Sequence, residues 1–461
     1  MTEAEWKQLL SERDARIAAL ESIILELRAQ INANSSKSNR PPSSDGLKKP
    51  APKSQRKSSG KNVGAQAGHP GSLLARSQPD TVIEHRPELD CHACGKPLPD
   101  ATCVESRQVV DIAPIALTVT EHRLFEAACS CGVASGSPWP PFVTTGVQYG
   151  ARIRALAVYL TQHHMLPFKR CANILEDVCG ASISVATLQY ACVQAAQELA
   201  PIVKKIGNAL SRAEVVHADE TGFRVEKRLH WLHTVCNQNL TFIHAHPKRG
   251  YEAIEAGGVL PRFHGILIHD CWKAYWRLKC EHGLCNAHLI RELTGLEEDY
   301  KQKWAGKLRL ILLEALGEIN RNMGALTPER LKQYQHRASI QIGYGKRDNP
   351  KQMKRKGGGK CKQSVATNLL IRFEKLKDDI WRFAYDIRVP FTNNCAEQAI
   401  RMPKVKQKVS GCFRTLAGAE RFCIIRSYLD TMRKQGKNLI ETLRGALQGA
   451  SVIPNYSPVA S

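Results

Sequence analysis

The sequence predicts a multidomain protein of the α+β class, and three observations support this. The chain has 461 residues, more than a single domain normally contains. The spacing of its apolar residues changes along the chain from a helical period to a strand period and back again. Two closely spaced pairs of cysteines also flank an extended stretch in the first third of the chain.

Composition limits the possible functions. The 66 Lys and Arg residues exceed the 43 Asp and Glu residues, giving a formal net charge of +23. This excess predicts a polyanionic partner, most commonly nucleic acid, with a membrane surface as the alternative. No apolar run approaches the roughly 18 residues of a membrane-spanning helix, and the acidic start lacks the profile of a signal peptide. We therefore expect a cytoplasmic protein without a membrane partner, whose 16 cysteines are mostly reduced and buried.

The N-terminal segment, residues 1–34, carries apolar residues at a seven-residue spacing. The repeat positions and the alternate seam are Leu10, Ile17, Ile24 and Ile31, with Leu20 and Leu27. This pattern predicts a coiled-coil helix and hence a homo-oligomer, or alternatively an amphipathic helix that packs on its own chain. Residues 35–79 are rich in Ser, Pro, Gly and Lys and predict a basic flexible linker, which either lies along phosphates or serves as a solubilising tether.

Residues 80–149 contain short extended runs broken by Pro and Gly, which predict a β-rich module. From 150 to 210 the apolar spacing is helical, with breaks at Leu166-Pro167 and Gly180-Ala181. The third helix should begin after Ser182 or Ser184, both good N-cap residues. The order fits a helix-turn-helix DNA-binding region, and three-helix packing without a DNA role is the alternative.

Beyond residue 214 the pattern predicts three strands, a helix and a fourth strand, the order of a mixed α/β sheet. The expected elements are strands 215–225, 229–236, 240–245 and 265–269, with a helix at 250–256. Helical patterns then dominate 287–326 and 364–385. The basic, glycine-rich segment 343–362 between them predicts either a phosphate-facing loop or an ordinary solvated one.

Three acidic residues are candidates for a metal-dependent active site. Asp219 and Asp270 each follow a short apolar run, so each carboxylate should lie at the open end of a strand. If the first and fourth strands are neighbours, these carboxylates converge, and a divalent cation such as Mg²⁺ or Mn²⁺ would relieve their repulsion. Glu397, at the start of a predicted helix, would complete a two-metal site for phosphoryl transfer.

A basic run follows Glu397 and is suited to holding a DNA backbone, although a solvated helix face is the alternative. Its members are Arg401, Lys404, Lys406 and Lys408. From chemistry alone the three acids would be a weak signal, because any large protein has many acids.

Longer stretches resemble a known family. The stretches are HADETGFRV, ILIHDCWKAYW, GLCNAHLIREL, NNCAEQAIRMPKVKQKVSGCFRT and GAERFCIIRSYLDTMRKQGKNLIETL. In this order they resemble the DDE transposases of the insertion sequence sixty-six family. The resemblance implies a ribonuclease H-like catalytic core with a helical insertion, in which Asp219, Asp270 and Glu397 are the catalytic, metal-binding acids. It also implies double-stranded DNA as the partner and small companion proteins encoded by the element.

The resemblance also implies one structural Zn²⁺, held by Cys91, Cys94, Cys129 and Cys131, because four thiolates satisfy tetrahedral zinc, and unligated buried thiols are the alternative. A second group, Cys280, His282, Cys285 and His288, has suitable residue types, but we favour packing or DNA contact there over zinc.

The expected function is that of a DNA transposase associated with the nucleoid, which cleaves at the element ends and transfers the 3′-OH strand to target DNA with two Mg²⁺ ions. A non-catalytic zinc-containing DNA-binding regulator and a ribonuclease H-like nuclease without strand transfer are the alternatives. The expected domains are the coiled-coil helix 1–34, linker 35–79, zinc module 80–149, helix-turn-helix region 150–210, catalytic core 211–410 with its insertion at about 296–390, and a small helical C-terminal region 411–461.

Overall fold

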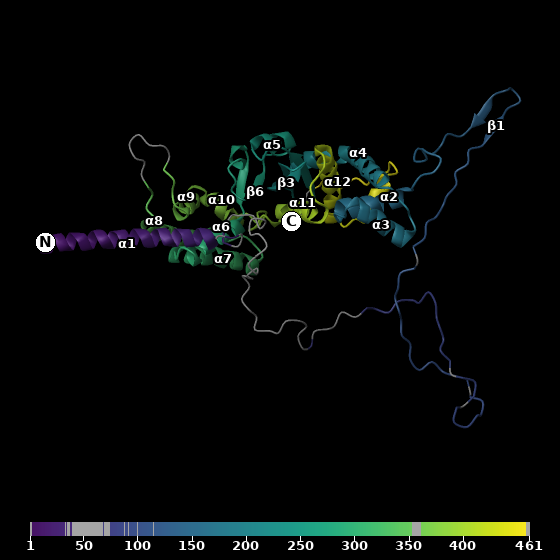
Figure 1. Cartoon of the computed structure of the whole chain (residues 1–461), viewed down its shortest axis with the longest axis horizontal. Coiled ribbons are helices and arrows are strands. Elements are labelled where there is room, and N and C mark those ends of the chain that lie inside the picture. Colours follow the sequence, from purple (N-terminus) through teal and green to yellow (C-terminus); the bar gives the residue numbers. More distant parts are fainter. Residues whose placement is uncertain are drawn as a thin grey trace. The chain divides into compact units, whose positions relative to one another are not determined.

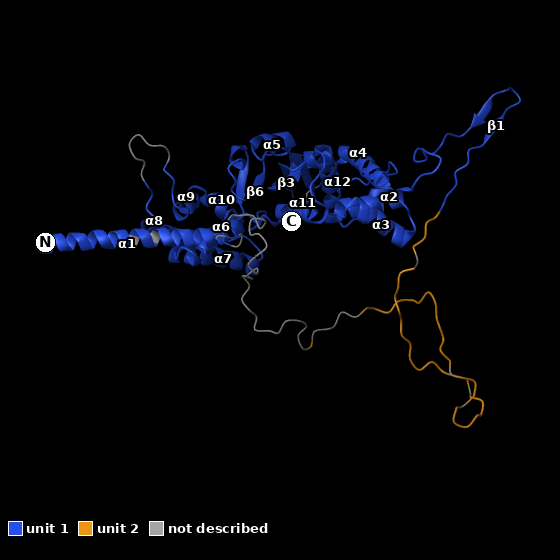
Figure 2. Cartoon of the chain, viewed as in Figure 1, with its two compact units in different colours: residues 1–50, 119–461 blue, residues 51–118 orange. Residues whose placement is uncertain are grey.

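The computed structural model describes residues 2–32, 34, 37–38, 68, 74–86, 88–90, 92–98, 100–113, 115–352 and 361–457 (Figure 1). The chain divides into two units, one formed by residues 1–50 with 119–461 and the other by 51–118 (Figure 2). Among the described residues, no helix is both long enough and apolar enough to cross a membrane.

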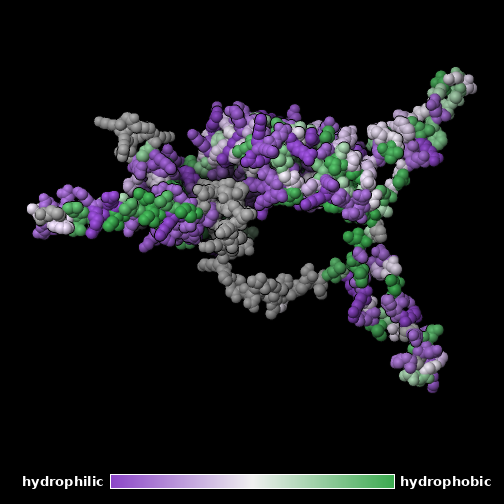
Figure 3. Space-filling view, viewed as in Figure 1, coloured by the Kyte–Doolittle hydropathy of each residue, from purple (hydrophilic) through white to green (hydrophobic). Residues whose placement is uncertain are grey.

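The N-terminal helix is present, as the sequence predicts. Helix α1 spans Glu3–Asn32 and starts with a capping box. In this box the Glu5 carboxylate accepts from the Thr2 amide at 2.6 Å, and the Thr2 hydroxyl accepts from the Glu5 amide at 3.4 Å. Ala29 is buried and Leu25 is partly buried, but most apolar side chains of α1 are exposed along the helix (Figure 3). Self-association through them stays a prediction.

The β-rich stretch is only partly a β structure. Strands β1 (Glu126–Ala128) and β2 (Ala134–Gly136) form an antiparallel hairpin. In the described part of 80–125, the chain forms a single isolated bridge, between Asp90 and Pro97. The apolar side chains of this stretch are exposed, so no buried face selects a register for further strands.

The helices expected between residues 150 and 210 are present. They are α2 (Ala151–Val158), continued by a π-helical turn at Tyr159–His163, then α3 (Phe168–Cys179) and α4 (Val185–Leu210). Gly180 ends α3 in the left-handed conformation, with φ of 67°. Ser184 caps α4, because its hydroxyl accepts a hydrogen bond from the Thr187 amide at 3.1 Å.

A five-stranded mixed sheet organises the larger unit. Its order is β5-β4-β3-β6-β7, where β3 is antiparallel to β4, β4 is antiparallel to β5, and β3, β6 and β7 are parallel. The strands are β3 (Val215–Val225), β4 (Arg228–Cys236), β5 (Thr241–His246), β6 (Ile266–His269) and β7 (Glu281–Leu284). The helix between β5 and β6 is α5 (Tyr251–Gly257). The four predicted strands and the helix are confirmed.

Each face of the sheet is covered by its own helical core. Leu267 of β6 packs on one side with α4, α12 and α13, whereas Ile266 and Ile268 pack on the other side with α6 to α10. This alternation follows from the two-residue repeat of a strand. The helices not yet given are α6 (Asn286–Glu298), α7 (Lys303–Asn322), α8 (Pro328–Asp348), α9 (Val365–Lys375), α10 (Lys377–Tyr385), α11 (Asn394–Ser410), α12 (Leu416–Lys434) and α13 (Leu439–Ala446).

Two elements differ from the sequence-based expectation. Strand β7 was not predicted, because its four residues include a glycine and give no alternating pattern. The segment 343–362 is not a loop throughout, since α8 continues to Asp348, and residues 353–360 lie outside the described residues. Helix α8 begins at Pro328 after the cap residue Thr327, whose hydroxyl accepts from the Arg330 amide at 3.3 Å.

Candidate active site

Two of the predicted acids lie on neighbouring parallel strands. His217 of β3 pairs with Ile268 of β6, and continuing this register by two residues brings Asp219 opposite Asp270. Both positions keep the same phase of the strand repeat, so both side chains belong to one face of the sheet. The condition set by the sequence, that the first and fourth strands are adjacent, is therefore met.

The Asp270 carboxylate lies where the chain leaves β6. Its Oδ1 accepts a hydrogen bond from the Trp272 amide at 3.0 Å, so the side chain closes a turn directly after the strand. The intervening residue, Cys271, has φ of 72°, a left-handed conformation that is uncommon for a residue other than glycine. This turn fixes Asp270 at the edge of the sheet.

Glu397 lies in the first turn of α11, and Asn393 just before the helix anchors that turn to β3. The Asn393 side-chain amide donates to the Ala218 carbonyl at 2.8 Å, and its Oδ1 accepts from His217 Nδ1 at 2.9 Å. Asn393 is buried, so these bonds are shielded from water. The start of α11 is thereby fastened to the two residues that precede Asp219.

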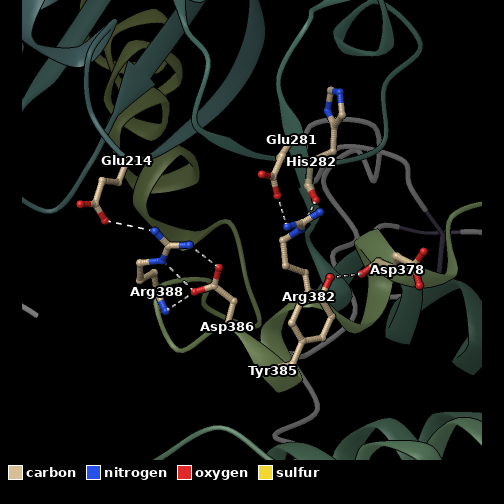
Figure 4. Close-up of polar contacts among 8 residues, drawn as sticks. All are labelled: Glu214, Glu281, His282, Asp378, Arg382, Tyr385, Asp386 and Arg388. Carbon is tan, nitrogen blue, oxygen red and sulfur yellow. Dashed lines mark hydrogen bonds and ion pairs between the residues drawn. The ribbon is translucent and has the colours of Figure 1, made fainter. Parts of the chain in front are cut away.

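A second set of contacts fastens the end of the helical insertion and the chain that follows it to the sheet (Figure 4). Arg382 of α10 forms an ion pair with Glu281 of β7 and donates to the His282 carbonyl at 2.8 Å. Further along, Arg388 forms ion pairs with Asp386 at 2.8 Å and with Glu214, the residue before β3, at 3.2 Å. Both arginines hold this segment at the starts of parallel strands, the edge of the sheet opposite to the one where Asp270 lies.

The negative charges of Asp270 and Glu397 act on the Asp219 carboxylate. Burial, followed by the negative charges of Glu220, Asp270 and Glu397, holds the pKa of Asp219 well above its usual value. A carboxyl group surrounded by other carboxylates is stabilised in its charged form when a cation lies among them. Oxygen donors are also the ligands that hard divalent cations prefer. The donor set therefore fits Mg²⁺ or Mn²⁺.

The Glu397 carboxylate is engaged by α6 rather than by the two aspartates. Its Oε1 accepts from His288 Nε2 at 3.2 Å and lies 3.8 Å from Arg291 Nη2 and 3.9 Å from the Cys285 thiol. The hydrogen bond from His288 is the main cause that lowers the pKa of Glu397. In the described part of the chain, three side chains that could bind one metal ion lie together, with their donor atoms within 4.8 Å of one another. They are Cys285, His288 and Glu397.

Glu220, next to Asp219, is occupied elsewhere. Its carboxylate accepts from Arg249 at 2.6 Å and from the Tyr275 hydroxyl at 2.7 Å. The Arg249 guanidinium lies 4.9 Å from the Trp231 ring and 4.5 Å from the Trp272 ring. Glu220 is therefore a buried partner of a stacked arginine.

The structure describes three of the four predicted zinc ligands. Cys91 lies outside the described residues, and Cys94 belongs to a different unit from Cys129 and Cys131. The latter two lie in the β1–β2 turn, where hydrogen bonds from the Cys131 backbone and thiol lower the pKa of the Cys129 thiol. A tetrathiolate zinc site stays a prediction.

The predicted DNA-contacting residues all lie on α11. Arg401 and Lys408 are exposed, and Lys404 is partly buried. Lys406 turns back onto its own protein, since its Nζ lies 4.3 Å from the Phe413 ring and 3.1 Å from the Ser410 hydroxyl. Contact of these residues with DNA stays a prediction.

Comparison with known families decides the identity. The transposase IS66 family matches residues 146–421, more than half of the chain. The chain belongs to the IS66 transposase family. Residues 2–75 of this transposase also match a family of unknown function (DUF6444). No curated protein matches the chain. The match includes Asp219, Asp270 and Glu397, and membership implies DNA binding and a DNA-processing activity.

Sequence reasoning did not name Asn393 as a site residue, and it named Cys285 and His288 only as members of a cysteine and histidine cluster, without their contact to Glu397. Asn393, Cys285 and His288 contact Glu397 or the strand beside it, although the sequence separates them widely from these partners. All three fall within the stretches that resemble the family, NNCAE and GLCNAH. The motifs marked their positions, but only the fold shows which atoms they contact.

Proposed function

We propose that this transposase binds the ends of its own mobile element, cleaves the phosphodiester there and transfers the 3′-OH strand to target DNA by a DDE mechanism. The observation that carries the proposal is the register of β3 and β6, which brings Asp219 opposite Asp270 beside the helix that carries Glu397. Carboxylates so arranged at the end of parallel strands are a typical setting for divalent metal chemistry.

The sheet supports a ribonuclease H-like core. Three antiparallel strands are followed by two parallel ones in the order β5-β4-β3-β6-β7, with helices on both faces. Helices α7 to α10 lie between α6 and α11 in the sequence and correspond to the insertion that the family resemblance implies. The acids then lie in the first strand, directly after the fourth strand, and in the helix that follows the insertion.

The residues of the chain have distinct tasks in this proposal. Asp219 and Asp270 would hold two Mg²⁺ ions between them, with Glu397 as a ligand of one. When bound, the ions supply charge neutralisation at the phosphate and activation of the attacking oxygen. Asn393 keeps the start of α11 against β3, so that Glu397 remains near the aspartates. Arg291 offsets the charge of Glu397 from the side of α6, and His288 donates a hydrogen bond to it.

Helices α3 and α4 support the end-binding part of the proposal. The turn between them, Gly180–Ser184, joins two helices in the manner of a helix-turn-helix module. The exposed first turn of α4 is the part of a recognition helix that contacts base edges in such modules. The net charge of +23 favours attraction of the phosphate backbone.

The test uses the full chain and linear duplex DNA carrying the inverted repeats that flank the coding sequence. Asp219→Asn, Asp270→Asn and Glu397→Gln should each reduce Mg²⁺-dependent cleavage on the order of a thousandfold or more, with end binding unchanged. Glu314→Gln, which removes an exposed acid of α7, should cleave normally.

Three readouts separate the possibilities. Gel shift reports end binding, a labelled 3′ end reports cleavage, and a supercoiled plasmid reports joining. Cleavage without joining would indicate a nuclease, and binding without cleavage would indicate a regulator. Retained cleavage by Asp270→Asn would remove that carboxylate from the mechanism.

A further inference from the structure

The cluster that holds Glu397 is itself a set of metal ligands of a different kind. Cys285 precedes α6, His288 lies in the first turn of α6, and Glu397 lies in the first turn of α11. Their Sγ, imidazole nitrogen and carboxylate oxygen all lie within 4.8 Å of one another. Two helix starts thus present a sulfur, a nitrogen and an oxygen donor to a common point.

The donor types decide which cation fits. A thiolate and an imidazole are poor ligands for Mg²⁺, which prefers oxygen, but they are preferred ligands for Zn²⁺ and similar transition metals. Three protein ligands also leave the fourth position of a tetrahedral ion open to water or a phosphate oxygen. These three ligands therefore differ in chemistry from the proposed all-oxygen site of Asp219, Asp270 and Glu397. Glu397 is the residue that the two sites share.

The surroundings of these ligands support the assignment. The Cys285 side chain is buried and accepts from the Asn393 amide at 3.2 Å, so its position is fixed before any ion binds. In the described structure, His288 Nδ1 is buried and has no hydrogen-bond partner, whereas Nε2 points to Glu397. A metal at Nε2 would take the place of the proton donated to Glu397 and leave the ring proton on Nδ1, which a metal-ligating imidazole normally donates to a neighbouring group or to water.

The other two residues of the sequence cluster do not take part. His282 Nδ1 lies 3.0 Å from His269 Nε2, and Cys280 packs against the core on the α4 side of the sheet. The group Cys280, His282, Cys285 and His288 is therefore not one site. The third ligand comes instead from α11, which no spacing near Cys285 could have indicated.

We propose that Cys285, His288 and Glu397 form a second, transition-metal site for Zn²⁺, and that its occupancy opposes the Mg²⁺-dependent reaction. Binding replaces the thiol proton, which is released to solvent. Because Glu397 cannot serve both sites at once, zinc bound here withdraws the third acid from the aspartate pair. The binding part stands on the geometry alone, and the inhibition part rests on the proposed function.

The binding test uses the full-length protein without DNA. We expect zinc per chain to fall by one equivalent in each of Cys285→Ser, His288→Ala and Glu397→Gln, and to stay unchanged in Cys412→Ser, an exposed cysteine outside the cluster. With Co²⁺ as the probe, sulfur-to-metal absorption should weaken in Cys285→Ser. His288→Ala should instead shift the visible bands that report coordination geometry.

Equal zinc content and identical Co²⁺ spectra in all variants would overturn the site. Circular dichroism reports folding, and if buried Cys285→Ser does not fold, His288→Ala and Glu397→Gln decide the outcome because both residues are partly exposed.

The inhibition test adds Zn²⁺ to Mg²⁺-dependent cleavage of end-containing DNA. Wild type should slow roughly tenfold, while His288→Ala should keep its own zinc-free rate. Equal inhibition of both proteins would overturn the inhibitory role. Zinc binding by a protein that never cleaves DNA would contradict the proposed transposase function but not the zinc site. Failure of the proposed function and failure of the zinc site are therefore distinguishable.

Discussion

At the scale of single residues, the three acids follow from the sequence and the residues that hold them do not. An apolar run that ends in an acid predicted a strand end at both Asp219 and Asp270. This is correct for Asp270, which directly follows β6, but Asp219 lies within β3, which continues to Val225. Asn393 and His288 have no such local signal. Their partners come from strands and helices distant in sequence, and a hydrogen bond between distant residues is visible only after folding.

Asn393 gives a prediction at this scale. Asn393→Ala removes the hydrogen bonds to Ala218 and His217 and leaves a buried carbonyl unpaired, which should cost about 1–3 kcal/mol of stability. Because α11 then loses its anchor on β3, cleavage should fall by roughly 10- to 100-fold although all three acids remain. Urea unfolding and single-turnover cleavage measure the two effects.

An exposed asparagine provides the control. Asn368→Ala on α9 should change neither quantity, since it lies outside the aspartate pair and the anchor. Wild-type cleavage by a correctly folded Asn393→Ala would show that α11 is positioned without this side chain.

At the scale of elements, long amphipathic patterns were predictable and short or polar ones were not. The breaks at Pro167 and Gly180 and the cap at Ser184 located three helices closely, because these residues act on the local backbone. Strand β7 was missed because it is short, and its place is set by pairing with β6. Helix α8 was missed as a whole, because it lies between the predicted helical ranges 287–326 and 364–385, and glycine and lysine in its last turns suggested a loop.

Helix α1 gives a prediction at the element scale. Ile17 and Ile24 are 45% and 48% exposed on a helix whose apolar repeat spans its length, so a second copy of the helix is the expected cover. Replacing both by Ser should shift the protein to a smaller oligomer in light scattering. Replacing the polar residues Arg16 and Glu21 by Gln should leave the mass unchanged. An unaltered mass in the Ile17→Ser, Ile24→Ser protein would contradict association through this face.

At the scale of the whole molecule, buried histidines link stability to pH. Burial, followed by the charge of Arg426, lowers the pKa of His163 to about 3. Burial likewise lowers the pKa of His233 to about 3 and that of His244 to about 4. His163 meets Arg426 from a distant part of the chain, whereas His233 and His244 are partners across the neighbouring strands β4 and β5.

The folded state should therefore lose stability in acid. Between about pH 6.5 and pH 4, the unfolded chain binds protons at these histidines whereas the folded chain does not, so the free energy of unfolding falls as the pH falls. Each histidine contributes about 1.4 kcal/mol per pH unit in that range. Urea midpoints measured from pH 7 to pH 4.5 should decline. The decline should be less steep in His163→Gln than in His336→Gln, which changes an exposed histidine. A midpoint that does not change with pH would contradict this.

The return of the chain to the sheet edge after α10 has an evolutionary consequence. Arg382 and Arg388 fasten both sides of that return to β7 and to the start of β3, and Asn393 then sets α11 on β3. The spacing of the acids thus depends on these anchors and not on how much chain lies between them. Descendants of this gene are free to lengthen, shorten or exchange the intervening helices, and so to acquire new contacts, while the chemistry beneath is inherited unchanged.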